Sequence, residues 1–366
     1  MKIVRVSELQ QYIGCKIARN VYIGEGQLYI GKNTELTAKS IEILQNKGDL
    51  LPFEYVYVHT PDSEGIELAE EVISDQLKFK AKKTINSVFD NINVASSRNF
   101  GEIINSIVDD LMENRNVIQG INTLLFYKKN DIAAHCLNTA IIASIIGVKL
   151  GLPRNNIENM AVGAALHDIG KARIPPEQLD SRKPEDLLAN QGHPLLGYQQ
   201  ADKSSLSLIA KRIILMHHVW EDYEASWESN HNIYQSFPNK LNNNSIDARF
   251  KDIYISIVQT ADVFDNMCTQ GLSKTAVLEY IRDMQYIRFG PGAKALLQCI
   301  SPYSLGSEVR LNNGMTALVA GHTDIPERPI ITFTKGPLKN STIDLTEKAY
   351  LTYQLEEKTG SQKGIL

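Results

Sequence analysis

Five of the eight histidines in this 366-residue chain fall between positions 135 and 218, close to aspartates in the same region. Imidazole nitrogens and carboxylate oxygens are common ligands of transition metals. The candidate ligands are His135, the adjacent pair His167 and Asp168, His193, the pair His217 and His218, and Asp262. A lone histidine is more often a satisfied core residue than a ligand, but that explanation would have to hold separately at each of these sites. Most of them lie in apolar helical sequence, where an unpaired polar group is costly to bury, so the pattern predicts one shared metal centre.

The donor set indicates which metals and which chemistry to expect. Imidazoles with one or two carboxylates suit Fe, Mn, Zn or Ni better than Mg or Ca, which prefer shells made of oxygen alone. Five histidines and two aspartates are too many for one ion, so two divalent ions bridged by a carboxylate are expected. Such a pair can lower the pKa of a bridging water and clamp the oxygens of a phosphoryl group. The predicted reaction is hydrolysis of a phosphoester.

The elements that position these residues are predicted to be helices. Apolar residues recur at spacings of three and four from Ile104 to Leu111, as in amphipathic helices. Helical character continues to about residue 299, and the polar stretch 221–244 predicts a long loop within it. His167 and Asp168 are expected near the end of a helix over residues 161–169.

The two ends of the chain are predicted to contain strands. Near the N-terminus, short β-branched and aromatic runs flank a helix expected over residues 37–47. Near the C-terminus, Asn313-Gly314 predicts a hairpin turn, and residues 330–333 a further strand. The expected fold class is mainly α, with a helical bundle between a small α+β module and a β-hairpin extension. The predicted boundaries are 1–66 for the N-terminal module, 67–130 for a helical linker, 131–300 for the bundle and 301–355 for the β extension.

Composition excludes several classes of partner. The net charge of -4 and the pI near 6.1 argue against binding to a nucleic-acid polymer or to an acidic membrane surface. The apolar stretch at residues 140–148 is too short for a membrane span, and the N-terminus does not have the pattern of a signal peptide. The four cysteines are scattered and contain no Cys-x-x-Cys pair. A reduced, cytoplasmic protein is therefore expected.

The order of the candidate ligands resembles that of the HD-GYP family, the HD-superfamily hydrolases that cleave the bacterial second messenger cyclic di-GMP. The likeness covers roughly residues 100–300. Leu166-His167-Asp168-Ile169-Gly170-Lys171, followed by Ile174-Pro175, is similar to the HD-x-G-K and I-P signature of the family. The later blocks are Gly192-His193-Pro194, Met216-His217-His218 and Ala261-Asp262-Val263-Phe264-Asp265. The resemblance implies that residues 131–300 form an HD-type helical bundle with phosphodiesterase activity.

The resemblance also implies a role for each residue. One ion would be bound by His135, His167, Asp168 and Asp262, and the other by Asp168, His193, His217 and His218, with Asp168 bridging. Lys171 would contact the scissile phosphate, unless it is only a solvated lysine, and Lys274 and Asp265 would be further substrate contacts. Asp131, one helical turn before His135, is a candidate ligand of a third ion, or else a helix cap or a solvated residue. Two or three ions, Fe or Mn, are expected.

Two features of the family are missing from this chain. The Asp-Gly-x-Gly-Tyr-Pro loop is absent after His218, and its best remnant is Ser236-Phe237-Pro238 in an expanded loop. Gly271 stands where the family carries an arginine that contacts the substrate phosphates, whereas Lys274 is kept. The metal ligands are therefore expected to be complete and the substrate-binding wall to be altered.

Three functions remain as alternatives. The first is hydrolysis of cyclic di-GMP by a metal-bridging hydroxide, which gives linear pGpG, GMP or both. The second is hydrolysis of another nucleotide phosphoester, and the third is a low-activity module that senses cyclic di-GMP or contacts a partner protein. The complete ligand set favours the two enzymes, whereas the altered loop favours the second and third functions. The expected protein partner is a second copy of the chain or a signalling protein.

Overall fold

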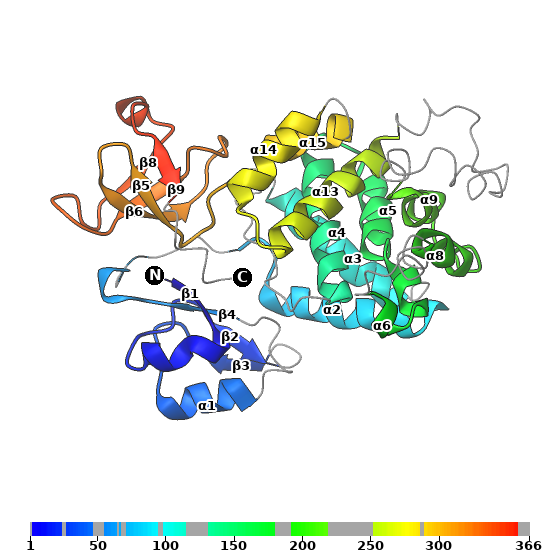
Figure 1. Cartoon of the computed structure of the whole chain (residues 1–366), viewed down its shortest axis with the longest axis horizontal. Helices are drawn as coiled ribbons and strands as arrows, with labels where there is room; N and C mark the ends of the chain where they lie inside the picture. The colour runs from blue at the N-terminus through cyan, green and yellow to red at the C-terminus, as the bar shows by residue number, and fades with distance from the viewer. Residues whose placement is uncertain are drawn as a thin grey trace.

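The computed structural model describes residues 2–23, 27–46, 55–63, 66, 71–93, 98–114, 131–179, 192–218, 252–285 and 289–357. In Figure 1 these residues form a helical body with two smaller, strand-containing parts beside it. Each of the three parts has a hydrophobic core of its own. The mainly α fold class is confirmed. The loop expected over residues 221–244 lies outside the described residues, and the domain boundaries stay predictions.

The helical body is built around α4 (Ile132–Lys149), which is buried on all sides and not along one stripe only. Both α5 and α13 pack directly against it. Among the described helices, α4 alone is long and apolar enough to cross a membrane, but 83% of it is buried inside the protein, as in a core helix. The other helices of the body are α2 (Asp75–Asp90), α3 (Arg98–Glu113), α5 (Arg154–Ala165), α6 (Pro176–Leu179), α8 (His193–Ala201), α9 (Leu208–Met216), α13 (Ile253–Thr269), α14 (Lys274–Met284) and α15 (Gly290–Leu297).

The N-terminal part contains two antiparallel strand pairs and one helix. The pairs are β1 (Lys2–Arg5) with β4 (Tyr55–Val58), and β2 (Val21–Ile23) with β3 (Gln27–Ile30). Helix α1 (Ala38–Asn46) confirms the helix predicted over residues 37–47. It turns Ile41 and Leu44 into the core of this part, where both are fully buried.

The C-terminal part is a five-stranded antiparallel sheet with the order β8-β7-β6-β5-β9. The predicted hairpin is confirmed, with Gly314 in the turn at a φ of +83°, a conformation that glycine adopts without strain. The predicted strand at residues 330–333 is β7, whereas the two short strands β8 and β9 were not predicted. The strands are β5 (Glu308–Leu311), β6 (Thr316–Gly321), β7 (Ile330–Phe333), β8 (Thr342–Asp344) and β9 (Leu355–Glu357).

Residues of the N-terminal part and of the C-terminal sheet meet in a small contact region. A small apolar cluster contains Ala18 and Tyr57 from the N-terminal part, Ile66, and Leu318 from the C-terminal sheet. Beside it, the Arg19 guanidinium lies over the ring of Tyr57, 4.4 Å from the ring centroid. The junction is therefore made of both apolar and charged contacts.

Candidate metal centre

His167 and Asp168 lie in the turn that follows α5. The helix ends at Ala165, and a 3-10 helix, Ile169–Arg173, begins directly after Asp168. The sequence prediction extended the α-helix to residue 169, because apolar periodicity does not distinguish an α-helix from a turn followed by a 3-10 helix. Both side chains point into the protein interior, and each residue is 1% exposed.

A close backbone contact places Asp168 next to His193. A Cβ atom built on Gly170 would lie 1.9 Å from the carbonyl oxygen of His193, the first residue of α8. One turn further into α8, a Cβ atom on Gly197 would lie 3.1 Å from the backbone nitrogen of Gly170. A residue with a side chain at position 170 would push the 3-10 helix and α8 apart. These two glycines therefore position metal-ligand candidates in addition to shaping the chain.

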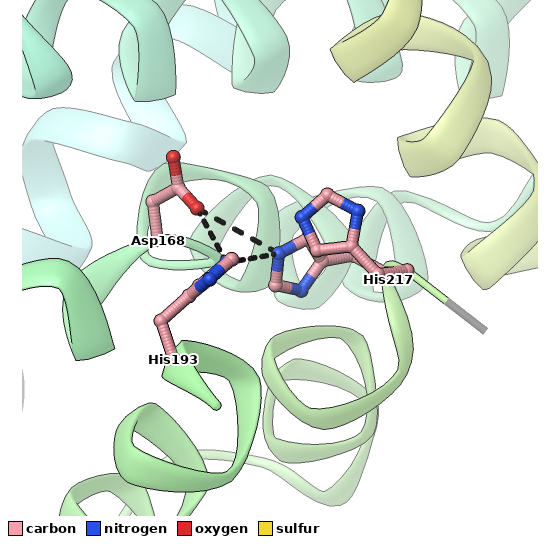
Figure 2. A group of neighbouring side chains, drawn as sticks. Asp168, His193 and His217 are labelled. Atoms are coloured by element: carbon pink, nitrogen blue, oxygen red, sulfur yellow. Dashed lines mark hydrogen bonds and ion pairs between the residues drawn. The ribbon is translucent and has the colours of Figure 1, made fainter. Parts of the chain in front are cut away.

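The ligand atoms of four side chains lie within 4.8 Å of one another: Asp168, His193, His217 and His218. These are the residues predicted to bind the second ion, and they are called the second group below. Figure 2 shows Asp168, His193 and His217 pointing toward a common point. Nε2 of His193 is 2.9 Å from Oδ1 of Asp168 and 3.1 Å from Nε2 of His217. Imidazole nitrogens and a carboxylate oxygen that converge in this way suit a transition-metal ion.

Three of the residues predicted to bind the first ion form another cluster, called the first group below. They are His135 from α4, His167, and Asp262 from α13. Nε2 of His135 is 3.0 Å from Oδ1 of Asp262, and Nε2 of His167 is 3.7 Å from the same oxygen. All three residues are buried. The packing of α4 against α13 thus brings together residues that are far apart in the sequence.

Asp168 lies between the two groups. Its Oδ1 atom is near Nε2 of His193 (2.9 Å) and of His217 (3.7 Å), both in the second group. Its Oδ2 atom is 3.5 Å from Nε2 of His167 and 3.8 Å from Nε2 of His135, both in the first group. One carboxylate oxygen thus faces each cluster, which is the geometry of a bridging ligand.

The hydrogen bonds of the histidines fit a metal ion. Nδ1 of His167 lies 2.8 Å from the carbonyl oxygen of Ala164, and Nδ1 of His217 lies 3.0 Å from that of Ile214. A carbonyl oxygen can only accept, so each Nδ1 carries the proton and each Nε2 presents a lone pair. Nε2 of His167 is buried and has no hydrogen-bond partner among the described residues. A cation bound between the lone pairs would satisfy such an atom, so the residues present fit a metal centre.

The electrostatics of the site favour neutral histidines and charged aspartates. Burial lowers the pKa of His167 and His193, and the pKa of His217 lies well below its ordinary value for the same reason. Burial would raise the pKa of Asp168, but the charge of Lys171 and the nearby imidazoles outweigh it and hold the pKa well below its ordinary range. These are the protonation states in which imidazole and carboxylate bind metals.

His135 differs from the other histidines. Burial would lower its pKa, but hydrogen bonds to Asp262 and Asp265 raise the pKa to about 10. The two carboxylates thus stabilise a positive charge at this point.

The remaining predicted site residues lie outside the two groups. Asp131 caps α4 by accepting a hydrogen bond from Ala134 N–H (3.1 Å), and it pairs with Lys82 at 2.5 Å. It thus has the capping role that the sequence left open as the alternative to a third metal ion. Lys274 donates to Ser304 Oγ (2.9 Å), in the segment before the C-terminal sheet. The contact of Lys274 with substrate stays a prediction.

Lys171 and Asp265 both contact members of the two groups. The ammonium of Lys171 is 2.6 Å from Oδ2 of Asp168, and its side chain is 26% exposed. Asp265 is 2% exposed and lies 2.7 Å from Nδ1 of His135, so it is a neighbour of a ligand where the sequence predicted a substrate contact. Asn138, which donates to Asp265, was not singled out from the sequence. A buried polar residue one turn after His135 in an apolar helix is the signal that could have found it.

The part of the chain that contains these residues matches a known family. Residues 132–267 match the family described as HD domain. The chain is 24% identical over 235 residues to the cyclic di-GMP phosphodiesterase PdeB of Borreliella burgdorferi, and the aligned part is 63% of this chain and 58% of PdeB. The chain therefore spans less than two thirds of the length of that relative.

A solved structure is also similar to this one. It is that of Bd1817, an HDG"Y"P protein from Bdellovibrio bacteriovorus, with 19% sequence identity and a TM-score of 0.47 over 80% of this chain and 97% of the other. The HD-domain match contains every residue of both groups. Residues 132–267 therefore match the HD-domain family, and the order of the candidate ligands within them resembles that of the HD-GYP family.

Proposed function

We propose that the chain is a metal-dependent phosphodiesterase that hydrolyses cyclic di-GMP to linear pGpG, GMP or both. The observation that carries this proposal is Asp168, with one carboxylate oxygen toward each group of ligand atoms. Pairs of metal ions about 3.5–4 Å apart are typical of enzymes that hydrolyse phosphoesters. The name of the Borreliella relative, a cyclic di-GMP phosphodiesterase, supports the choice of substrate.

In this proposal each group holds one ion, and Asp168 is shared between them. When bound, the two ions would supply a water of lowered pKa and would stabilise charge on the phosphoryl oxygens. The chain itself contributes buried ligands with fixed orientations, because the Nδ1 atoms of His167 and His217 are tied to backbone carbonyls. The nitrogen-rich donor set favours Fe or Mn over Mg or Ca, and it is compatible with two ions.

Lys171 is proposed to contact the phosphoryl group of the substrate. Its ammonium lies beside Oδ2 of Asp168 at the partly exposed edge of the buried ligands. A fixed cation at that edge can stabilise the negative charge that develops on the phosphoryl oxygens during the reaction. Asp131 and Lys274 have no role in this proposal, because their side chains are used in a helix cap and in a bond to Ser304.

The second candidate function is hydrolysis of a different nucleotide phosphoester, and the glycine at position 271 supports it. This glycine has a φ of +106°, and the N–H of Leu272 after it donates to the carbonyl of Met267 (3.2 Å), which closes α13. An arginine at this position would be strained. The arginine with which the HD-GYP family contacts the substrate phosphates is therefore replaced by a glycine that ends α13. Without that contact, a substrate other than cyclic di-GMP could be preferred.

The test is to purify the protein anaerobically, measure its metal content and separate the products formed from cyclic di-GMP. We expect bound Fe or Mn and a linear product. Asp168→Ala should lose both the metal and the product, whereas Asp283→Ala, at an exposed position on α14, should keep both.

Two other outcomes would redirect the assignment. If the protein contains metal but does not hydrolyse cyclic di-GMP, this molecule is not its substrate. Hydrolysis of another nucleotide phosphoester would then support the second candidate function. Binding of cyclic di-GMP that survives in Asp168→Ala, with no turnover by the wild type, would indicate a sensor. The cytoplasmic location and the protein partner, a second copy of the chain or a signalling protein, stay predictions from the sequence.

A further inference from the structure

Asp265 and Asn138 form a buried pair behind His135. Oδ2 of Asp265 is 2.7 Å from Nδ1 of His135, and Oδ1 of Asp265 accepts a hydrogen bond of 2.7 Å from the amide of Asn138. Asp265 is 2% exposed and Asn138 is 1% exposed. Both oxygens of this carboxylate are therefore engaged inside the protein.

The pairing follows from the spacing of two packed helices. Asp262 and Asp265 are three residues apart on α13, and His135 and Asn138 are three residues apart on α4. Residues at this spacing lie on one face of a helix. The ring of His135 is consequently held between two carboxylates, with Nε2 at 3.0 Å from Asp262 and Nδ1 at 2.7 Å from Asp265.

This arrangement distinguishes His135 from two other candidate ligands. His167 and His217 direct Nδ1 to backbone carbonyls of residues three positions earlier in the chain. Those acceptors come with the fold and cannot be altered by a side-chain substitution. The Nδ1 acceptor of His135 is a charged side chain from another helix, and its orientation depends in turn on Asn138.

We infer that Asp265 and Asn138 are positioning residues that hold His135 with its proton on Nδ1, so that the Nε2 lone pair is directed to the ion of the first group. The amide of Asn138 can only donate to Asp265, and this leaves the other carboxylate oxygen to accept from His135. A carboxylate behind a metal-bound imidazole fixes its tautomer and raises its basicity. The inference rests on the proposed metal centre and replaces the substrate-binding role predicted for Asp265.

The test uses an exchange of the two side chains. In Asp265→Asn, the carboxylate that faces Nδ1 of His135 becomes a neutral amide, so the imidazole loses basicity, and an amide nitrogen that faces Nδ1 would force the proton onto Nε2. We expect the affinity for the first ion to fall about 10- to 100-fold, with the second group unaffected. Adding Asn138→Asp restores the pattern, because the introduced carboxylate would accept from the new amide, whose oxygen then faces His135 again. The double variant should regain much of the lost affinity.

The readouts are metal equivalents retained after dialysis and the electron paramagnetic resonance spectrum of the protein loaded with Mn²⁺. The wild type should give the spectrum of a coupled pair, Asp265→Asn that of an isolated ion, and the double variant the coupled pair again. Asp283→Asn, the same substitution at an exposed position on α14, is the matched control and should match the wild type.

The outcomes separate this inference from the proposed function. A wild type that binds no metal would overturn both. A wild type with a coupled pair, and an Asp265→Asn variant that keeps the pair at full affinity, would overturn the inference alone. Loss of metal from both groups in Asp265→Asn, without recovery in the double variant, would show that Asp265 supports the fold and does not position one ligand.

Discussion

The ammonium of Lys171 lies 2.6 Å from Oδ2 of Asp168, so this charge stands at the edge of the proposed metal centre. Lys171→Met keeps most of the volume of the side chain and removes the charge. We expect kcat for phosphoester hydrolysis to fall about 10²- to 10³-fold while the bound metal is retained. Steady-state kinetics and metal analysis of the same preparation test this.

The matched control for this prediction is Arg173→Met. Arg173 is an exposed cation in the same 3-10 helix and hydrogen-bonds to Gln200 at 3.2 Å. Its replacement should leave kcat nearly unchanged. Equal losses in the two variants, or loss of metal from Lys171→Met, would mean that Lys171 acts through the structure and not on the substrate.

The sequence was sufficient to identify the members of both groups, because histidines and aspartates are rare in apolar helical segments unless a binding partner compensates for their burial. It could not assign Asp265, which follows Asp262 in the same motif and has the same chemistry. What separates the two residues is the side of the His135 ring that each one meets, and that depends on how α4 packs against α13.

At the scale of elements, the contact between the 3-10 helix and α8 is the feature most sensitive to a small change. Gly170→Ala would place a Cβ atom 1.9 Å from the carbonyl oxygen of His193, so the backbone must move. We expect the free energy of unfolding to fall by about 1–3 kcal/mol and the metal affinity of the second group to fall with it. Chemical unfolding and metal titration measure the two effects.

Gly101→Ala provides the control within a helix. Position 101 lies in α3, and a Cβ atom there would meet nothing within 4 Å. Alanine should stabilise that helix by about 0.5–1 kcal/mol, the opposite sign to the effect at Gly170. If Gly170→Ala is also neutral or stabilising, the close approach of the two elements does not position His193.

The sequence predicted the presence of most elements better than their ends. Apolar periodicity is strong in α3, and α4 is a long run of almost continuously apolar residues. Neither signal is present in three-residue strands such as β8 and β9, which depend on neighbouring strands for their hydrogen bonds. The end of α5 was placed too late because the turn at Leu166–Asp168 is as buried and apolar in its surroundings as the helix before it.

At the scale of the whole molecule, Glu71 links the N-terminal part to the helical body. Its carboxylate pairs with Arg19 on one side and with Lys78 of α2 on the other. Burial would raise the pKa of Glu71, but the charges of Lys78 and Arg19 outweigh it and hold the pKa below its ordinary value. One helical turn further along α2, Lys82 pairs with Asp131 at the start of α4, the helix that carries His135.

This network predicts a pH-dependent contribution to stability. Because the pKa of Glu71 is lower in the folded state than in the unfolded state, its stabilisation is present at neutral pH and is lost as the pH falls below the ordinary glutamate value of 4.5. Glu71→Gln should lower the free energy of unfolding by about 3 kcal/mol at neutral pH, with a smaller difference from the wild type in acid.

Urea unfolding at several pH values measures this difference, with Glu279→Gln on the exposed face of α14 as the control. The comparison must be between variants, because Asp75 has a pKa raised by burial and contributes with the opposite sign. A difference between wild type and Glu71→Gln that grows on acidification would contradict the account. The sequence could not predict this network, because Arg19 and Glu71 are 52 positions apart and nothing in either segment points to the other.

Anomalous diffraction from crystals of the anaerobically purified protein, collected at the Fe and Mn absorption edges, would test whether two ions share Asp168. We expect two anomalous peaks about 3.5–4 Å apart. One should lie among His135, His167 and Asp262, the other among His193, His217 and His218, with one oxygen of Asp168 toward each. A single peak, or two peaks of which one or both lie out of reach of Asp168, would contradict the account.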